Sequence, residues 1–178
     1  MFEAQDANTN LERRQLLRGK IRNQRPPMRP PWAQHEDAFV QLCTRCDDCI
    51  KSCEGNILYR SSGGYPEISF ESEGCDFCGD CLNACTTDAL QAPVPAPSLA
   101  WKHRATIQSD CLSLNGIVCQ SCGDSCDTDA ISFRLETKGR VTPLLDQSIC
   151  NGCGECVAVC PSNSITLNVP EENSPNGQ

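Results

Sequence analysis

The sequence predicts an α+β protein that consists of two tandem modules with little conventional core. Sixteen cysteines fall into four closely spaced sets along the 178 residues. Two segments between these sets alternate apolar and polar residues around turn signals, as β-hairpins do. Hydrophobic residues make up 39% of the chain, and about 30% remain for an apolar core once the cysteines are left out. The cysteines must therefore organise the fold.

Each cysteine set contains four thiols, and no cysteine is left over. The sets are Cys43, Cys46, Cys49 and Cys53; Cys75, Cys78, Cys81 and Cys85; Cys111, Cys119, Cys122 and Cys126; and Cys150, Cys153, Cys156 and Cys160. Three sets follow the pattern C-x2-C-x2-C-x3-C, in which three thiolates bind one 4Fe-4S cluster and the fourth reaches a neighbouring cluster. We therefore predict that all sixteen cysteines are iron ligands of up to four 4Fe-4S clusters.

Structural zinc and disulfides are the competing explanations for so many cysteines. Zinc sites use two C-x2-C pairs separated by a longer loop, so a third thiol just beyond each pair would be surplus. Disulfides need an oxidising compartment. The N-terminal residues contain no apolar run of about 7–15 residues, which a secretory signal requires. No window of about 18 residues is apolar enough to span a membrane. We expect a cytoplasmic protein without direct membrane insertion.

The third set is irregular, because seven residues separate Cys111 from Cys119. Cys111 must return across a short loop to join Cys119 and Cys122. We expect Cys111 to be a ligand. The alternative is a site that holds a 3Fe-4S cluster or no cluster.

Small residues stand beside the ligands in most sets. Gly79, Gly123, Gly152 and Gly154 would let the backbone turn sharply around a cluster and point N–H groups at its sulfurs. Asp47 stands at the corresponding position of the first set. Either it makes that cluster's surroundings more negative, or it simply faces water.

Two hairpins and a linker separate the cysteine sets. Residues 57–72 predict a hairpin that turns at Gly63-Gly64, and residues 131–147 predict another near Lys138-Gly139. Prolines 93, 95 and 97 predict a stiff linker between the second and third sets. The predicted organisation is a basic N-terminal arm (1–35), module 1 with the first two sets (36–92), a Pro-rich linker (93–100), module 2 with the last two sets (101–169) and a tail (170–178).

A hairpin that joins two cluster-binding turns is the plan of a two-cluster bacterial-type ferredoxin. This plan pairs neighbouring sets, so the fourth cysteine of one set joins the first three of its neighbour. The alternative is a nested pairing of outer with outer and inner with inner sets. The nested pairing would need a hairpin where the prolines lie.

The charges are divided unevenly along the chain. Residues 11–31 hold seven basic side chains and one acidic side chain, whereas residues 32–178 hold eight basic and twenty acidic ones. An acidic body argues against nucleic-acid binding. We interpret the basic segment as a solvated arm, with docking to an acidic partner as the alternative.

Other residues give no sign of catalysis. No Ser-His-Asp or Cys-His grouping indicates a nucleophile, so we predict that the protein is not an enzyme. We interpret His35 and His103 as surface residues. Trp32 and Trp101 each precede a module and are predicted to cap small cores.

Four segments together resemble the NapF family, the ferredoxin-type accessory proteins of the periplasmic nitrate reductase system. The segments are RPPWAQHEDAFVQLCTRCDDCIKSC, GGYPEISFESEGCDFCGDCLNAC, CLSLNGIVCQSCGDSCDTDAISF and CNGCGECVAVCPSNSITL. The resemblance covers residues 11–168 and includes the irregular third set and the block that follows Arg29.

The resemblance implies a cytoplasmic iron–sulfur protein that associates with the catalytic subunit precursor of periplasmic nitrate reductase. It would help that subunit mature before export, through electron transfer or cluster assembly. A soluble polyferredoxin carrier, or an iron–sulfur subunit of a larger reductase, is the alternative. Arg13-Arg14 resembles a twin-arginine export box but lacks the apolar region that follows such a box. The pair is either a relic or mimic of that box or part of an ordinary basic arm.

Overall fold

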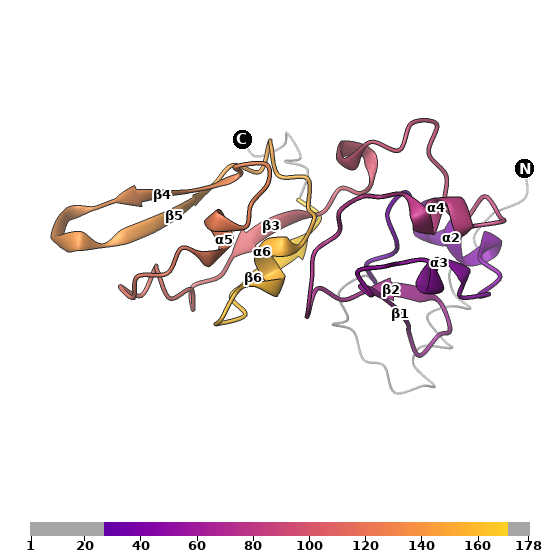
Figure 1. The fold of residues 1–178 in the computed structure, drawn as a ribbon, viewed down its shortest axis with the longest axis horizontal. Coiled ribbons are helices and arrows are strands. Elements are labelled where there is room, and N and C mark those ends of the chain that lie inside the picture. Colours follow the sequence, from indigo (N-terminus) through magenta and orange to yellow (C-terminus); the bar gives the residue numbers. More distant parts are fainter. Residues whose placement is uncertain (1–26, 171–178) are drawn as a thin grey trace, which may run out of the picture.

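The computed structural model describes residues 27–170, and these form two modules side by side along the long axis (Figure 1). Module 1 contains α2 (Glu36–Leu42), α3 (Asp48–Lys51), β1 (Leu58–Arg60), β2 (Pro66–Ile68) and α4 (Asp80–Ala84). Module 2 contains β3 (Arg104–Ile107), α5 (Ser121–Asp124), β4 (Ile131–Leu135), β5 (Val141–Leu145), α6 (Glu155–Ala158) and β6 (Ile165–Asn168). The predicted α+β class is confirmed.

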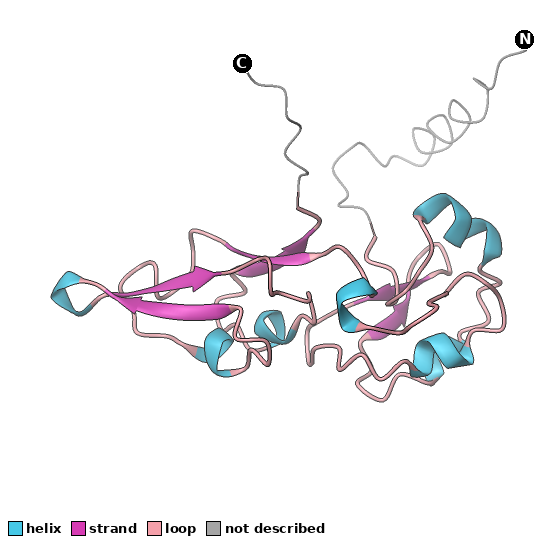
Figure 2. Ribbon diagram, turned by 90° about the horizontal axis from the view of Figure 1, so that it is seen from above, coloured by secondary structure: helices cyan, strands magenta, loops and turns pink. Residues whose placement is uncertain are grey.

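Both predicted hairpins are present. Strands β1 and β2 are antiparallel, and the chain between them turns at Gly64, whose φ is +80°. Strands β4 and β5 pair from Ile131 opposite Leu145 to Leu135 opposite Val141. Their turn is the 3-10 helix η2 (Thr137–Gly139). This second hairpin projects away from module 1 (Figures 1 and 2).

A third two-stranded sheet joins the beginning and the end of module 2. Strand β3 is antiparallel to β6, with Ala105 opposite Leu167 and Ile107 opposite Ile165. The strand partners lie about 60 residues apart, so no local turn announces the pairing. The sequence therefore did not predict β3 as a strand.

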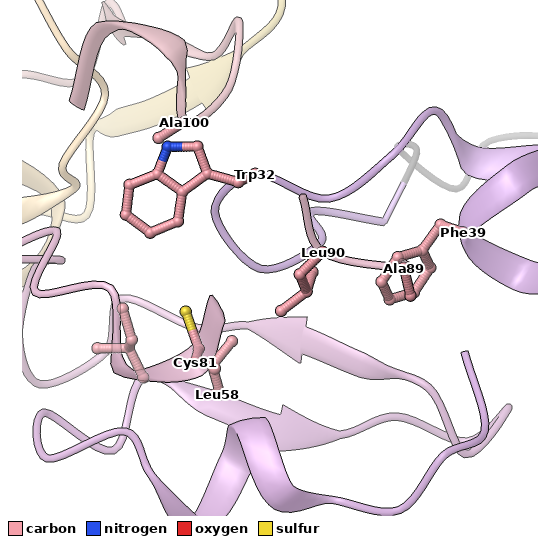
Figure 3. Packing of buried hydrophobic residues seen from close by; sticks show 8 residues of the cluster. Trp32, Phe39, Leu58, Cys81, Ala89, Leu90 and Ala100 are labelled. Carbon is pink, nitrogen blue, oxygen red and sulfur yellow. The ribbon is translucent and has the colours of Figure 1, made fainter. Parts of the chain in front are cut away.

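Each module has a small core of its own, and cysteines are part of both. The first core combines Cys81 with buried residues from several segments, including Trp32, Leu58 and Leu90 (Figure 3). The second core includes Cys122, Cys150 and Cys156. Thiols therefore occupy positions that aliphatic side chains fill in an ordinary domain.

Residues 28–33 pack against module 1, although the sequence places them in the basic arm. Ile68 N–H donates a hydrogen bond to the Met28 carbonyl, and Pro30 and Pro31 are fully buried. Trp32 N–H donates to the Ala100 carbonyl at 2.8 Å. Module 1 thus begins before residue 36. Most of the predicted arm, including the Arg13-Arg14 pair, lies outside the described residues. Residues 171–178 of the predicted tail also lie outside them.

The Pro-rich linker ends in contact with module 1. Its last part forms the 3-10 helix η1 (Pro97–Leu99), which is followed by the buried Ala100. The Trp32 indole N–H donates to the Ala96 carbonyl at 3.3 Å. Trp32 therefore connects the start of module 1 to the segment that leads into module 2.

Replacing Trp32 should destabilise module 1. Trp32 is only 4% exposed, and truncation of a buried tryptophan to alanine costs about 3–5 kcal/mol of unfolding free energy. Anaerobic unfolding of the loaded Trp32→Ala protein, followed by circular dichroism and by loss of visible cluster absorbance, measures the effect. Leu99→Ala is the control because Leu99 is exposed in η1. Equal effects of the two substitutions would contradict this view of the core.

Candidate iron–sulfur sites

The described cysteines gather into four groups, each with three thiols from one set and one thiol from its neighbour. We name them site A (Cys43, Cys46, Cys49, Cys85), site B (Cys53, Cys75, Cys78, Cys81), site C (Cys111, Cys119, Cys122, Cys160) and site D (Cys126, Cys150, Cys153, Cys156). This grouping follows the tandem pairing of neighbouring sets and not the nested one.

Sites A and B lie in module 1. The four cysteines of site A line one hollow. Burial, together with the nearby thiols of Cys43 and Cys85, raises the pKa of Cys49 to about 11. The four cysteines of site B line a larger hollow of about 730 Å³. Burial and neighbouring thiols, Cys75 first among them, raise the pKa of Cys81 to about 12.

Sites C and D lie in module 2. The four cysteines of site D line a common hollow, and burial with the adjacent Cys153 and Cys150 raises the pKa of Cys156 to about 12. At site C, burial and then Cys111 and Cys119 raise the pKa of Cys122 to about 11. Cys111 therefore lies close enough to Cys122 to affect its ionisation.

The loop of the third set returns Cys111 to its group. The Asn115 side-chain amide donates to the Cys111 carbonyl at 2.9 Å, and Gly116 has a φ of +82°. The buried Ser113 hydroxyl donates to the Val141 carbonyl in β5 at 2.6 Å. These contacts fold the seven intervening residues into a compact turn and anchor the turn to the β4–β5 hairpin.

The donor set fits a multi-atom cationic core. Burial and mutual repulsion both disfavour grouped thiolates, as the raised cysteine pKa values indicate, so a positive partner is needed. Within residues 27–170, no group of three or more His, Cys, Asp or Glu side chains is arranged to hold a single metal ion. Thiols that surround a hollow without converging on one point suit an iron–sulfur cluster.

Glycines shape three of the turns beside the ligands. Gly79 and Gly154, which precede α4 and α6, have φ values of +84° and +85°, and Gly152 has +75°. Gly123 differs because its φ is not positive. Its role is steric, since a Cβ there would lie 2.5 Å from a carbon of the Phe133 ring.

Asp47 adopts the same left-handed conformation as these glycines, with a φ of +67°. It lines site A, and its carboxylate Oδ2 accepts a hydrogen bond from Arg60 Nε at 2.9 Å. Its other oxygen, Oδ1, is buried and has no hydrogen-bond partner among the described residues. The interpretation that Asp47 simply faces water is therefore wrong. The carboxylate is part of the surroundings of site A, with Arg60 as its counter-charge.

Hydroxyl groups near the fourth cysteine of a set escaped the sequence predictions. Thr87, Thr128 and Ser162 each place an oxygen 3.6–3.7 Å from the sulfur of Cys85, Cys126 or Cys160, two residues earlier. Hydrogen bonds to cysteine sulfur tune cluster potentials. The sequence feature that could have predicted these contacts is a Ser or Thr two residues after the last cysteine of a set. Cys53 lacks this neighbour because residue 55 is glycine.

Ser164 adds two further hydrogen bonds to Cys160. Its backbone N–H donates to the sulfur at 3.3 Å, and its hydroxyl lies 3.5 Å away. Burial would raise the pKa of Cys160, but the hydrogen bonds from Ser164 and Ser162 outweigh burial and lower it. Site C thus contains a thiol that is already suited to the thiolate form.

The two histidines differ in exposure. His35 is exposed, as predicted. His103 is half-buried, and its Nδ1 is buried without a hydrogen-bond partner among the described residues, so its interpretation as a surface residue is wrong. Burial and the neighbouring Arg104 lower the pKa of His103.

None of the helices within residues 27–170 is long and apolar enough to cross a membrane.

Comparisons with known proteins identify two 4Fe-4S dicluster domains in the chain. Family models of a 4Fe-4S dicluster domain match residues 18–90 and residues 117–164. The second match begins after Cys111. Two dicluster domains and sixteen cysteines account for up to four 4Fe-4S clusters.

Several known proteins are similar to the chain over most of its length. Ferredoxin-type protein NapF of Escherichia coli strain K12 is 42% identical over 157 residues, which cover 88% of this chain and 94% of the relative. NapF of Haemophilus influenzae strain Rd is 42% identical over 176 residues, covering 92% and 97%. Ferredoxin-type protein NapG of E. coli K12 is 30% identical over 151 residues, covering 75% and 65%. No solved structure matches the chain.

Double substitutions should reveal which cysteines share a cluster. Anaerobically isolated protein should contain about sixteen irons per chain, and loss of one cluster should remove about four. Cys49→Ala with Cys85→Ala affects site A alone and should remove about four irons, whereas Cys49→Ala with Cys53→Ala affects two sites and should remove about eight. Iron and acid-labile sulfide analysis measures both. Equal losses would contradict the grouping.

Removing the counter-charge of Asp47 should change the potential of site A. Arg60→Gln leaves the carboxylate uncompensated beside the cluster, which favours the oxidised form and lowers the reduction potential. An anaerobic redox titration followed by electron paramagnetic resonance (EPR) measures the shift. Arg134→Gln is the matched control, because it breaks an ion pair with Glu136 near the end of the β4–β5 hairpin. A similar shift in both variants, or in neither, would contradict the prediction.

Proposed function

The chain belongs to the NapF family of ferredoxin-type proteins, and from this membership we propose that it is a cytoplasmic accessory protein of periplasmic nitrate reductase. In this role it binds the precursor of the catalytic subunit before export and helps it mature, through electron transfer or cluster assembly. The observation that carries the proposal is the extent of the similarity, which covers 94% and 97% of two NapF relatives.

We assign the cysteines of sites A to D as the iron ligands. Each group combines four thiols from two neighbouring sets, and the cost of burying thiolates together supports a cationic occupant. When bound, the clusters supply one-electron redox chemistry. The chain supplies the thiolates, holds their spacing, and places Thr87, Thr128 and Ser162 beside sulfur atoms.

The exposure of ligand cysteines in module 1 supports docking of a partner on this module. Cys46 of site A and Cys78 of site B are exposed, whereas the cysteines of sites C and D are buried or half-buried. Electron exchange between proteins requires close approach to a redox centre. A partner surface over site A would reach Cys46 directly.

Charge supports a partner with a basic contact surface. Residues 32–178 carry twenty acidic and eight basic side chains. Charges of this sign steer a protein toward basic surfaces and away from nucleic acid.

Anaerobic affinity capture from nitrate-grown cells tests the proposed partner. The tagged chain should recover the nitrate reductase catalytic subunit with its signal sequence still attached. Cells grown without nitrate serve as the control for background. A Cys46→Ala bait should recover less of the subunit, because it damages the exposed site.

Recovery of only mature catalytic subunit, or of membrane components alone, would contradict the maturation role. That outcome would favour the alternative function, a polyferredoxin electron carrier or an iron–sulfur subunit of a larger reductase. Mass spectrometry of the captured subunit distinguishes the outcomes, since it reads the N-terminus directly.

A further inference from the structure

We propose that the four sites form one electron-transfer chain in the order A–B–D–C, and that electrons cross between the modules where Cys75 meets Cys153. This order differs from the order of the cysteine sets in the sequence. The inference uses only the electron-transfer part of the proposed function. Its test needs no partner protein, so failure of the partner assignment would leave it standing.

The two modules touch through residues that belong to sites B and D. Cys75 N–H donates a hydrogen bond to the Cys153 carbonyl at 2.7 Å. The hollow of site B is lined by its own four cysteines and also by Cys153, Asp127 and Glu155 of module 2. The backbone of one candidate ligand is thus hydrogen-bonded directly to the backbone of another.

Tight packing of Gly74 against Glu155 fixes this contact. Gly74 N–H donates to the Glu155 carboxylate Oε2 at 2.8 Å. A Cβ on Gly74 would lie 2.6 Å from that oxygen and 2.7 Å from the Glu155 backbone nitrogen. Because the φ of Gly74 is not in the left-handed region, this close approach, and not backbone conformation, requires glycine at residue 74.

Aromatic side chains pack around the same junction. The Phe70 and Trp101 rings meet edge to face with centroids 6.3 Å apart, and the Phe77 ring lies 5.4 Å from Trp101. The Trp101 indole N–H donates to the Asn151 carbonyl at 3.1 Å. A Cβ on Gly154 would collide with the Phe70 ring. Trp101 therefore packs between the modules, where the sequence predicted a cap on one core.

Within each module, the sites at the junction adjoin the remaining two. Helix α4 carries Cys81 of site B, and Cys85 of site A follows directly at its end. In module 2, α6 carries Cys156 of site D, and Cys160 of site C follows two residues after its end. Helix α6, which carries Cys156, lies between module 1 and α5, which carries Cys122 (Figure 1). Sites A and C are therefore the two ends of the electron-transfer chain.

Clusters held by the cysteines of sites B and D would supply one-electron chemistry. A transfer across this contact would take one electron from one site and give it to the other, in either direction. The rate of electron tunnelling falls steeply with distance, so the direct hydrogen bond between the backbones of Cys75 and Cys153 favours a crossing at this contact.

Gly74→Ala tests the crossing because it forces the modules apart at Glu155. Gly63→Ala is the matched control, because a Cβ there would make only an ordinary contact of 3.5 Å with Tyr65. Both loaded proteins should keep the iron content of the wild type. In the dithionite-reduced wild type and in Gly63→Ala, EPR should detect a magnetic interaction between modules in addition to those within each module. Gly74→Ala should lose that interaction.

Kinetics test whether electrons use the contact. Photoreduced deazaflavin, a one-electron donor, is added in less than stoichiometric amount, and freeze-quenched EPR follows redistribution of electrons between the clusters. The wild type should equilibrate its modules at a rate independent of protein concentration. In Gly74→Ala the rate should depend on concentration, because electrons must then pass between molecules.

A second pair of variants guards against misfolding of Gly74→Ala. Glu155→Gln keeps an oxygen that can accept from Gly74 N–H and should behave as the wild type, whereas Glu155→Ala should resemble Gly74→Ala. The proposal is overturned if the wild type shows no interaction between modules, or if its equilibration depends on concentration. It is also overturned if the iron-replete variant proteins, Gly74→Ala or Glu155→Ala, retain both wild-type behaviours.

Discussion

Burial of thiolates is the constraint on which this structure depends. Four negative sulfurs repel one another and lose hydration when they are grouped in a protein interior, so the fold requires cationic iron at their centre. Helices α3, α5 and α6 have only four residues each, far below the length at which a helix is stable alone. Their positions follow from the ligands they carry and not from amphipathic faces. The free energy of cluster binding therefore makes up most of the folding free energy of the protein.

Local sequence patterns predicted much of this architecture. The cysteine spacing and the Gly63-Gly64 turn indicated the module plan, because both act over a few residues. The β3–β6 pairing could not be predicted in this way, since its two strands come from opposite ends of module 2. The sequence left two interpretations of Asp47 open, because only the backbone reveals that it takes the left-handed conformation usually reserved for glycine. The junction at Gly74 has no periodic pattern at all and depends on a steric fit between distant segments.

The four sites share one plan but differ in their immediate surroundings. Site A has the Asp47–Arg60 pair, and site C has the Ser162 and Ser164 hydroxyls beside one sulfur. Site B lacks the hydroxyl that follows the fourth cysteine in the other three sets. Hydrogen bonds and nearby charge set cluster potentials. These differences allow the reduction potential of each site to be tuned separately, without any change in ligand type.

The end-to-end arrangement of the two modules has a consequence for electron transfer through the protein. An electron carrier with one docking site must release its donor before it can bind its acceptor, so diffusion limits every turnover. If sites A and C are opposite ends of one electron-transfer chain, a donor and an acceptor can bind at the same time. The protein would then act within a ternary complex, and the rate of intramolecular electron transfer would limit turnover.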